Sequence, residues 1–130
     1  MNVETQIEKF NSDNLTSAIE TCYAKPFYRV LIVAPKMVMP TGLIVIDCVS
    51  KLYPHERSKF RIKPDLITFP NGSLLKIITQ NSTARGRRVH KVLLSDMSNT
   101  DLMQRLYPMI IDYEEEQKWW DKTSLRNDGI

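Results

Sequence analysis

Short apolar runs separated by turn residues fill the middle of the chain. The runs at 66–69 and 74–78 flank Asn71-Gly72, the turn dipeptide typical of a β-hairpin. A further apolar run, at 89–94, leads directly into Ser95-Asp96. We therefore predict a hairpin followed by a strand that ends in an acid, which is the place where α/β proteins put their chemistry.

The first half of the chain predicts two helices with a buried strand between them. Residues 3–24 are expected to be helical, with Ser12 or Asp13 as a cap, and residues 11–14 could break an earlier helical turn from the main helix. The continuous apolar run at 28–34 is typical of a strand that is buried on both faces of a parallel sheet. Residues 43–53 carry apolar side chains at helical spacing and predict the second helix.

The remaining segments complete an alternating order of helices and strands. Residues 55–64 form a basic connector, and Asn99 or Thr100 is placed to cap a helix that Pro108 kinks or splits. An acidic helix or tail follows over 112–122, with two adjacent tryptophans as packing anchors. This order predicts an α/β fold, a small three-layer domain with a mostly parallel sheet plus a β-hairpin.

Composition is compatible with one globular domain spanning residues 1–130. The chain is 42% hydrophobic and 25% charged, and its length allows a core without disulfide staples. A net charge of +3 permits a nucleic-acid partner without requiring one. Glu4 and Glu8 lie where the basic segment of a signal peptide would be, so we expect a cytoplasmic protein that is not bound to a membrane.

The residues that most often carry catalysis show no catalytic arrangement. Cys22, Cys48, His55 and His90 have neither the spacing of a zinc site nor the context of a nucleophile. His90 lies between Val89 and Lys91 at a strand entrance, where a surface position is expected. No Gly-x-x-x-x-Gly-Lys phosphate loop is present in the sequence. No catalytic residue is therefore predicted.

Four segments, in this order, resemble the ATPase domain of phage large terminase subunits, the DNA-packaging motors. They are RVLIVAPK at 29–36, ITFPNGS at 67–73, Arg85-Gly86, and VLLSD at 92–96. The motor domain of superfamily 2 helicases is the second resemblance, because its apolar strand also ends in Ala-Pro. The resemblance spans residues 14–111 and implies a truncated P-loop motor fold in a viral protein, with Asp96 as the magnesium ligand of the Walker B strand.

The chain departs from both families at the residues that hydrolyse ATP. Met97 stands where the families have the glutamate that polarises water, and the phosphate-binding glycines and lysine are absent. The helix ending at Ala24 resembles the one that follows the P-loop, so the chain is expected to begin after that loop and its strand. The resemblance therefore implies a degenerate domain that lacks autonomous ATPase activity, needs no cofactor of its own, and retains at most magnesium at Asp96.

Basic side chains concentrate in two loops that could contact phosphates. The predicted nucleic-acid-binding residues are Arg85, Arg87, Arg88 and Lys91 after the hairpin, and Arg57, Lys59, Arg61 and Lys63 in the connector. Cations that contact phosphates release counterions, which makes binding sensitive to salt. No aromatic residue is interleaved with the arginines of the loop at 85–88, so base stacking is not predicted there.

The sequence leaves three classes of function open. The first is a nucleic-acid-binding or protein-binding module, regulatory in a DNA packaging or replication machine. The second is a subunit of a split ATPase or nuclease completed by another chain, with Asp96 as metal ligand and Arg85 as charge stabiliser. The third is a structural protein that interacts through a sheet edge or through Trp119-Trp120.

Self-association is predicted from the strand at 89–94. A motor fold without its first strand would leave one side of this strand unpaired, and exposed edges are usually covered. The hairpin at 66–79, the N-terminal segment or a second chain could provide the cover. A homodimer is the simplest external solution, because two like edges bury each other; a packaging or replication protein is the other partner.

Overall fold

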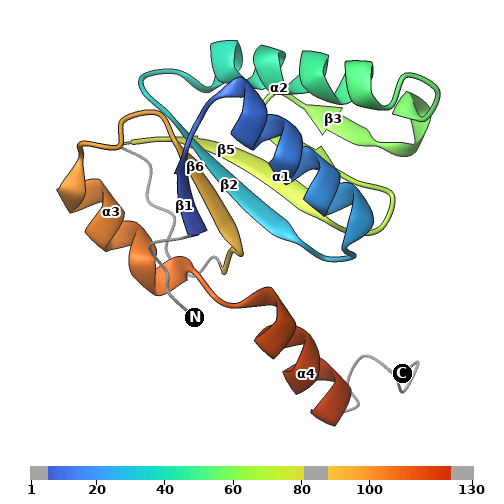
Figure 1. Cartoon of the computed structure of the whole chain (residues 1–130). Coiled ribbons are helices and arrows are strands. Elements are labelled where there is room, and N and C mark those ends of the chain that lie inside the picture. Colours follow the sequence, from blue (N-terminus) through green and yellow to red (C-terminus); the bar gives the residue numbers. More distant parts are fainter. Residues whose placement is uncertain (1–5, 81–87, 124–130) are drawn as a thin grey trace.

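The structure, a computed structural model, describes residues 6–80 and 88–123. Within these residues, a six-stranded sheet has the order β1-β6-β2-β5-β4-β3 and carries helices on both faces (Figure 1). The strands are β1 (Ile7–Lys9), β2 (Arg29–Ala34), β3 (Arg61–Lys63), β4 (Leu66–Thr68), β5 (Leu74–Thr79) and β6 (Lys91–Leu94). The helices are α1 (Ser12–Ala24), α2 (Val38–Leu52), α3 (Thr100–Leu106) and α4 (Tyr113–Thr123), with short 3-10 turns η2 (Arg57–Lys59) and η3 (Tyr107–Met109). The predicted α/β class is confirmed.

Strand β2 lies inside the sheet, between β6 and β5, and pairs with both in parallel. Its residues 30–34 are completely buried, as the apolar run predicts. Side chains alternate between the faces of a strand. Val30 and Ile32 therefore join the core under α1 and α2, whereas Leu31 and Val33 join the core under α3.

Strand β1 is a correction to the sequence analysis. Residues 3–24 were expected to form a helix, but Ile7–Lys9 pairs with β6 in parallel, with Ile7 opposite Val92. Helix α1 begins only at Ser12, after the Asn11 side chain accepts the N–H of Asn14 at 2.8 Å. Pairing with a distant strand decides the structure of so short a segment, and local helical spacing does not.

The same strand removes the premise of the predicted homodimer. Strand β1 occupies the side of β6 that we expected to be open, so β6 has a parallel neighbour on each side. The N-terminal segment, one of the three covers considered, therefore closes this part of the sheet. The edges formed by the described residues are the three-residue strands β1 and β3.

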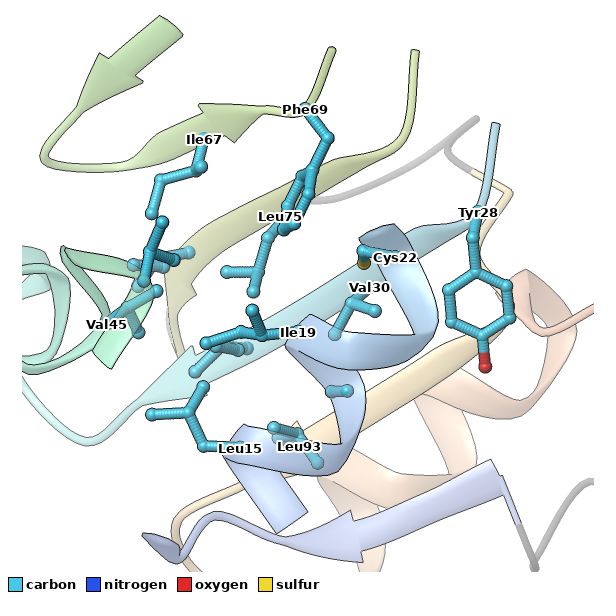
Figure 2. Packing of buried hydrophobic residues seen from close by; sticks show 14 of the residues in the cluster. Leu15, Ile19, Cys22, Tyr28, Val30, Val45, Ile67, Phe69, Leu75 and Leu93 are labelled. Carbon is cyan, nitrogen blue, oxygen red and sulfur yellow. The ribbon is translucent and has the colours of Figure 1, made fainter. Parts of the chain in front are cut away.

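Helices α1 and α2 cover one face of the sheet and form the larger core (Figure 2). In Figure 2, Ile19 of α1 lies over Val30 of β2, and Val45 of α2 lies near Ile67 of β4. The side chains buried in this cluster come from both helices and from strands β2, β4, β5 and β6. The cluster therefore ties the parallel part of the sheet to the hairpin.

Helix α2 begins at Val38, earlier than the predicted start at residue 43. Pro40 fits the first turn because the N–H groups there have no partner inside the helix. Gly42 is buried where α2 crosses the turn between β3 and β4, and a Cβ atom at Gly42 would lie 2.1 Å from the carbonyl oxygen of Pro64. The glycine therefore allows the close approach of helix and turn.

The predicted hairpin is confirmed as β4 and β5, which pair antiparallel on either side of Asn71-Gly72. Gly72 has a φ of 89°, a conformation that favours glycine. The basic connector at 55–64 contains more structure than predicted, because η2 is followed by β3, which pairs antiparallel with β4. The connector thus becomes the edge of the sheet.

The other face of the sheet is covered by α3 and η3. Asn99 caps α3, and Pro108 lies in the 3-10 turn that follows the helix, as predicted. Helix α4 then lies beyond one end of the sheet (Figure 1). Trp119 was expected to be a packing anchor, but it is 52% exposed. Among the described helices, none has both the length and the apolar character needed to cross a bilayer.

Candidate functional site

Asp96 follows β6 at the carboxyl end of the parallel strands, as predicted. Its exposed carboxylate accepts hydrogen bonds from the hydroxyl (2.5 Å) and the backbone N–H (3.0 Å) of Ser98. These two bonds lower the pKa of Asp96. Asn99 then accepts the N–H of Leu102 at 3.0 Å and starts α3. Asp96 therefore stabilises the turn that leads into this helix.

The connection between β1 and α1 consists of Phe10 and Asn11. The Phe10 N–H donates to the carbonyl of Leu94 at 3.0 Å, so the chain follows β6 almost to the helix. A phosphate cradle needs a longer loop whose N–H groups surround the anion. The described residues also contain no group of three or more His, Cys, Asp or Glu side chains placed to hold a metal. Magnesium at Asp96 would need ligands from elsewhere.

In the first predicted basic group, the side chains that the structure describes are bound to neighbouring residues. Arg85 and Arg87 lie outside the described residues. Arg88 donates to the carbonyl of Pro108 at 3.1 Å. Lys91 forms an ion pair with Glu8 of β1 at 2.5 Å. Arg88 therefore ties the segment just before β6 to η3, and Lys91 ties β6 to β1.

The second predicted basic group lies in the edge strand β3 and in the turn η2 that precedes it, at the opposite side of the sheet. Arg57, Lys59, Arg61 and Lys63 are all exposed, and we call these four residues the basic strip. Strands β2, β5 and β4 separate the basic strip from β6, so the two predicted groups do not form one surface. In β3, Ile62 packs against the core, and Arg61 and Lys63 alternate with it.

The ion pairs around the basic strip leave much of its charge available. Lys59 lies 3.8 Å from Glu56, a long contact between an exposed and a half-buried side chain. Asp65, the acid next to Lys63 in sequence after Pro64, is instead bound by Lys76 at 2.7 Å. The hydrogen bond from Lys76 lowers the pKa of Asp65. Arg61 and Lys63 have no ion pair with any described residue.

Aromatic rings lie directly beside the basic strip. Tyr23, in the last turn of α1, stacks on Tyr53 with the ring centroids 4.2 Å apart and an angle of 13° between the planes. Phe60, which links η2 to β3, lies 6.0 Å from Tyr53. This stack was not predicted from the sequence, because its rings come from three separate segments.

An open cavity lies against the exposed member of this stack. It is lined by Tyr23, Glu56, Lys59, Pro70 and Asn71. The Tyr23 hydroxyl donates a hydrogen bond to Glu56, and this bond raises the pKa of Tyr23. Lys59 belongs both to the cavity and to the basic strip. The cavity thus combines an aromatic wall with a cation at its rim.

His90 is buried, so the prediction of a surface side chain is wrong. Its Nδ1 accepts the backbone N–H of Arg29 at 2.9 Å, and its Nε2 lies 3.0 Å from Glu116 of α4. Because Nδ1 is an acceptor, Nε2 carries the proton and donates to Glu116. Burial lowers the pKa of His90, and the nearby charge of Arg29 adds to this effect.

Glu116 completes a network that joins α4 to the sheet. The Arg29 guanidinium donates to Glu116 at 2.8 Å. Burial alone would raise the pKa of Glu116, but the hydrogen bonds and charges of Arg29 and His90 together lower it. Both His90 nitrogens are engaged, so this histidine helps to hold α4 against the sheet. The sequence could not predict that His90 is buried, because its partner Glu116 lies in another element, α4.

A second surface feature is an apolar patch on the N-terminal half of α2. Met37, Met39, Leu43 and Ile44, which we call the α2 patch, are each more than half exposed. Ile44 also lines a groove between α1 and α2 whose other apolar walls include Phe10 and Leu52. Clustered exposed apolar side chains usually mark an interaction surface.

Comparison of the chain with protein-family models, curated proteins and solved structures found no match. Its function is therefore inferred from the contacts and charges described above.

Proposed function

We propose that this domain binds nucleic acid through the basic strip. The observation that carries the proposal is the set of four exposed cations in the edge strand β3 and in the turn η2 before it, three of which have no ion pair with a described residue. Phosphate groups provide regularly spaced negative charges along an extended chain, which these cations can follow. Each contact releases condensed counterions and so favours binding most at low salt.

The proposed role is that of a binding or regulatory module without ATP hydrolysis of its own. The two-residue connection between β1 and α1 supports this role, because it has no loop of N–H groups that could surround a phosphate. Met97 next to Asp96 supports it as well, since a thioether cannot polarise water. Asp96 itself is engaged by Ser98 in a turn.

The resemblance to terminase and helicase motor domains stays a proposal about origin and context. On this proposal, the domain would act in a viral DNA packaging or replication machine. Two features are compatible with it: β6 is a parallel strand inside the sheet, and Ser95-Asp96 follows its carboxyl end. In the competing enzyme class, a second chain would complete an ATPase or nuclease site around Asp96. Nucleotide binding by the isolated chain would favour that class.

The experiment compares two variants of equal net charge. In the strip variant, Arg57, Lys59, Arg61 and Lys63 are all replaced by Gln. The control variant replaces four other exposed cations, namely Lys9, Lys36, Arg105 and Lys118. Each variant changes the formal net charge from +3 to −1, since four positive charges are removed.

Binding of a labelled oligonucleotide is then followed by fluorescence anisotropy at fixed salt. We expect the strip variant to lose at least tenfold in affinity, because each phosphate contact removed weakens binding. The control variant should lose clearly less, since it keeps the strip and shares the same net charge. Equal losses in the two variants would mean that only overall charge matters, and the proposal would be wrong.

A second proposal is self-association through the α2 patch. It is favoured by four large apolar side chains that are exposed in the first half of α2 and at the residue just before it. Pairing two such helices about a two-fold axis would remove both patches from water. Sedimentation at micromolar concentration should show a dimer for the natural sequence and a monomer for Leu43→Lys. A monomer at all concentrations for the natural sequence would rule out this dimer.

A further inference from the structure

We infer that the ligand of the basic strip is a single strand and that one of its bases stacks on Tyr23 in the adjacent cavity. The inference rests on the proposed function and deepens it by naming the class of nucleic acid. Single-strand binding proteins combine a cationic track for the backbone with aromatic rings for the bases. The structure brings these two components together at one end of the strip.

Tyr23 has the placement that a stacking residue requires. Its ring is 37% exposed and forms one wall of the cavity, while Tyr53 supports the ring from behind at 4.2 Å. The hydrogen bond to Glu56 fixes the orientation of the ring. A ring that is already immobilised loses little conformational freedom when a base stacks on it.

Asn71, another residue of the cavity lining, is also fixed by hydrogen bonds. The Asn71 side-chain amide donates to the carbonyl of Cys22 at 2.8 Å and to that of Tyr23 at 3.1 Å. Its oxygen accepts the N–H of Ser73 at 3.0 Å. These bonds connect the hairpin turn to the end of α1, so Asn71 is held in place beside Tyr23 in the lining of the cavity.

Charge determines which part of a nucleotide enters the cavity. Glu56 lines the cavity, and its negative charge disfavours a phosphate there, whereas a carboxylate can accept hydrogen bonds from the amino groups of a base. Lys59 lies at the same cavity and continues into the strip, where a phosphate is attracted. The base is therefore expected inside and its backbone outside. In a duplex, the base faces are covered by their neighbours and cannot reach the ring.

The first test removes the ring from the protein. Tyr23→Leu should bind a single-stranded oligonucleotide about tenfold more weakly than the natural sequence, because stacking on one base has roughly this effect. Tyr23→Phe keeps the ring and should stay within about twofold of the natural affinity. Trp119→Leu removes another exposed aromatic ring, far from the strip on α4, and should change nothing. Duplex affinity should be the same for all three variants.

The second test removes the bases from the ligand and does not depend on how well a variant folds. The natural protein should bind a strand of abasic sugar-phosphate units about tenfold more weakly than a base-bearing strand of equal length. Tyr23→Leu should bind both strands equally. If the natural protein binds both strands equally well, the inference is wrong, even when the strip variant has lost affinity. If the strip variant loses no affinity for any of these ligands, the proposed function itself fails. Binding to proline-rich or aromatic peptides without binding to any strand would also overturn the inference.

Discussion

Replacement of His90 by Leu tests the structural role assigned to this histidine. Leucine fills a similar volume in the core but can neither accept the Arg29 N–H nor donate to Glu116. In the native structure, these bonds are 2.9 Å and 3.0 Å long, and the His90 side chain is 1% exposed. The substitution therefore leaves two polar groups without their partner while apolar packing is largely kept.

The expected loss follows from these two groups. A buried N–H without an acceptor costs about 1–3 kcal/mol, and a hydrogen bond to a charged carboxylate contributes about 1.5–3 kcal/mol. Glu116 keeps its ion pair with Arg29, and leucine restores some packing, so the total is expected near the lower end, at about 3 kcal/mol. For a chain of this size, that corresponds to a fall in melting temperature of roughly 10 °C.

The pH dependence provides an independent readout of the same site. The pKa of His90 is lowered in the folded protein, so the unfolded chain binds a proton more readily. Stability is therefore fully present above the ordinary histidine pKa of about 6.5 and falls as the pH decreases below it. Glu116 adds a further loss at lower pH, starting near the ordinary value of 4.5, because its pKa is also lowered.

Urea unfolding at pH 7.5 and at pH 5.5 measures both effects. The natural protein should be less stable at pH 5.5, and His90→Leu should reduce this difference because it removes the titrating group. His55→Leu is the matched control, since His55 is exposed and its replacement should cost less than about 0.5 kcal/mol. If His90→Leu has the stability and the pH dependence of the natural protein, the network does not hold α4 as described.

Three further predictions address other parts of the fold. Gly42→Ala should destabilise the protein by about 1–3 kcal/mol in thermal unfolding, because the new Cβ would lie 2.1 Å from the Pro64 carbonyl oxygen. The same change stabilises most helices, so unchanged or increased stability would contradict the packing of α2. Gly72→Ala should cost about 1–2 kcal/mol in the same assay, since φ is positive and the new atom would meet the Phe27 ring; a stabilised protein would argue against this turn. Asp96→Ala should leave oligonucleotide affinity within twofold, and a large loss would return Asp96 to the functional site.

Elements with local signals were predicted well from the sequence. The apolar run that became β2 needs no partner information, because a strand buried on both faces is apolar throughout. Asn71-Gly72 specified the hairpin, and Pro108 ended α3, through backbone restrictions that act within a few residues. These features depend on the chain next to them and are therefore visible in the sequence.

The missed features depend on residues that are distant in sequence. Strand β1 is only three residues long, and it is defined by pairing with β6. The burial of His90 depends on Glu116, which lies in α4. The stack beside the basic strip joins Tyr23 of α1 to Tyr53 at the end of α2. Periodicity and spacing carry no information about contacts between distant residues. The basic residues of the strip were therefore predicted, but their aromatic neighbours were not.

The most direct test of the central claim is the dependence of single-strand affinity on salt. The natural protein and the strip variant are titrated with the same oligonucleotide at several salt concentrations. If the four cations of the strip contact phosphates, the logarithm of the association constant should fall against the logarithm of salt with a slope of about −3. The strip variant should show a slope near zero. A slope that is the same for both proteins would contradict nucleic-acid binding by the basic strip.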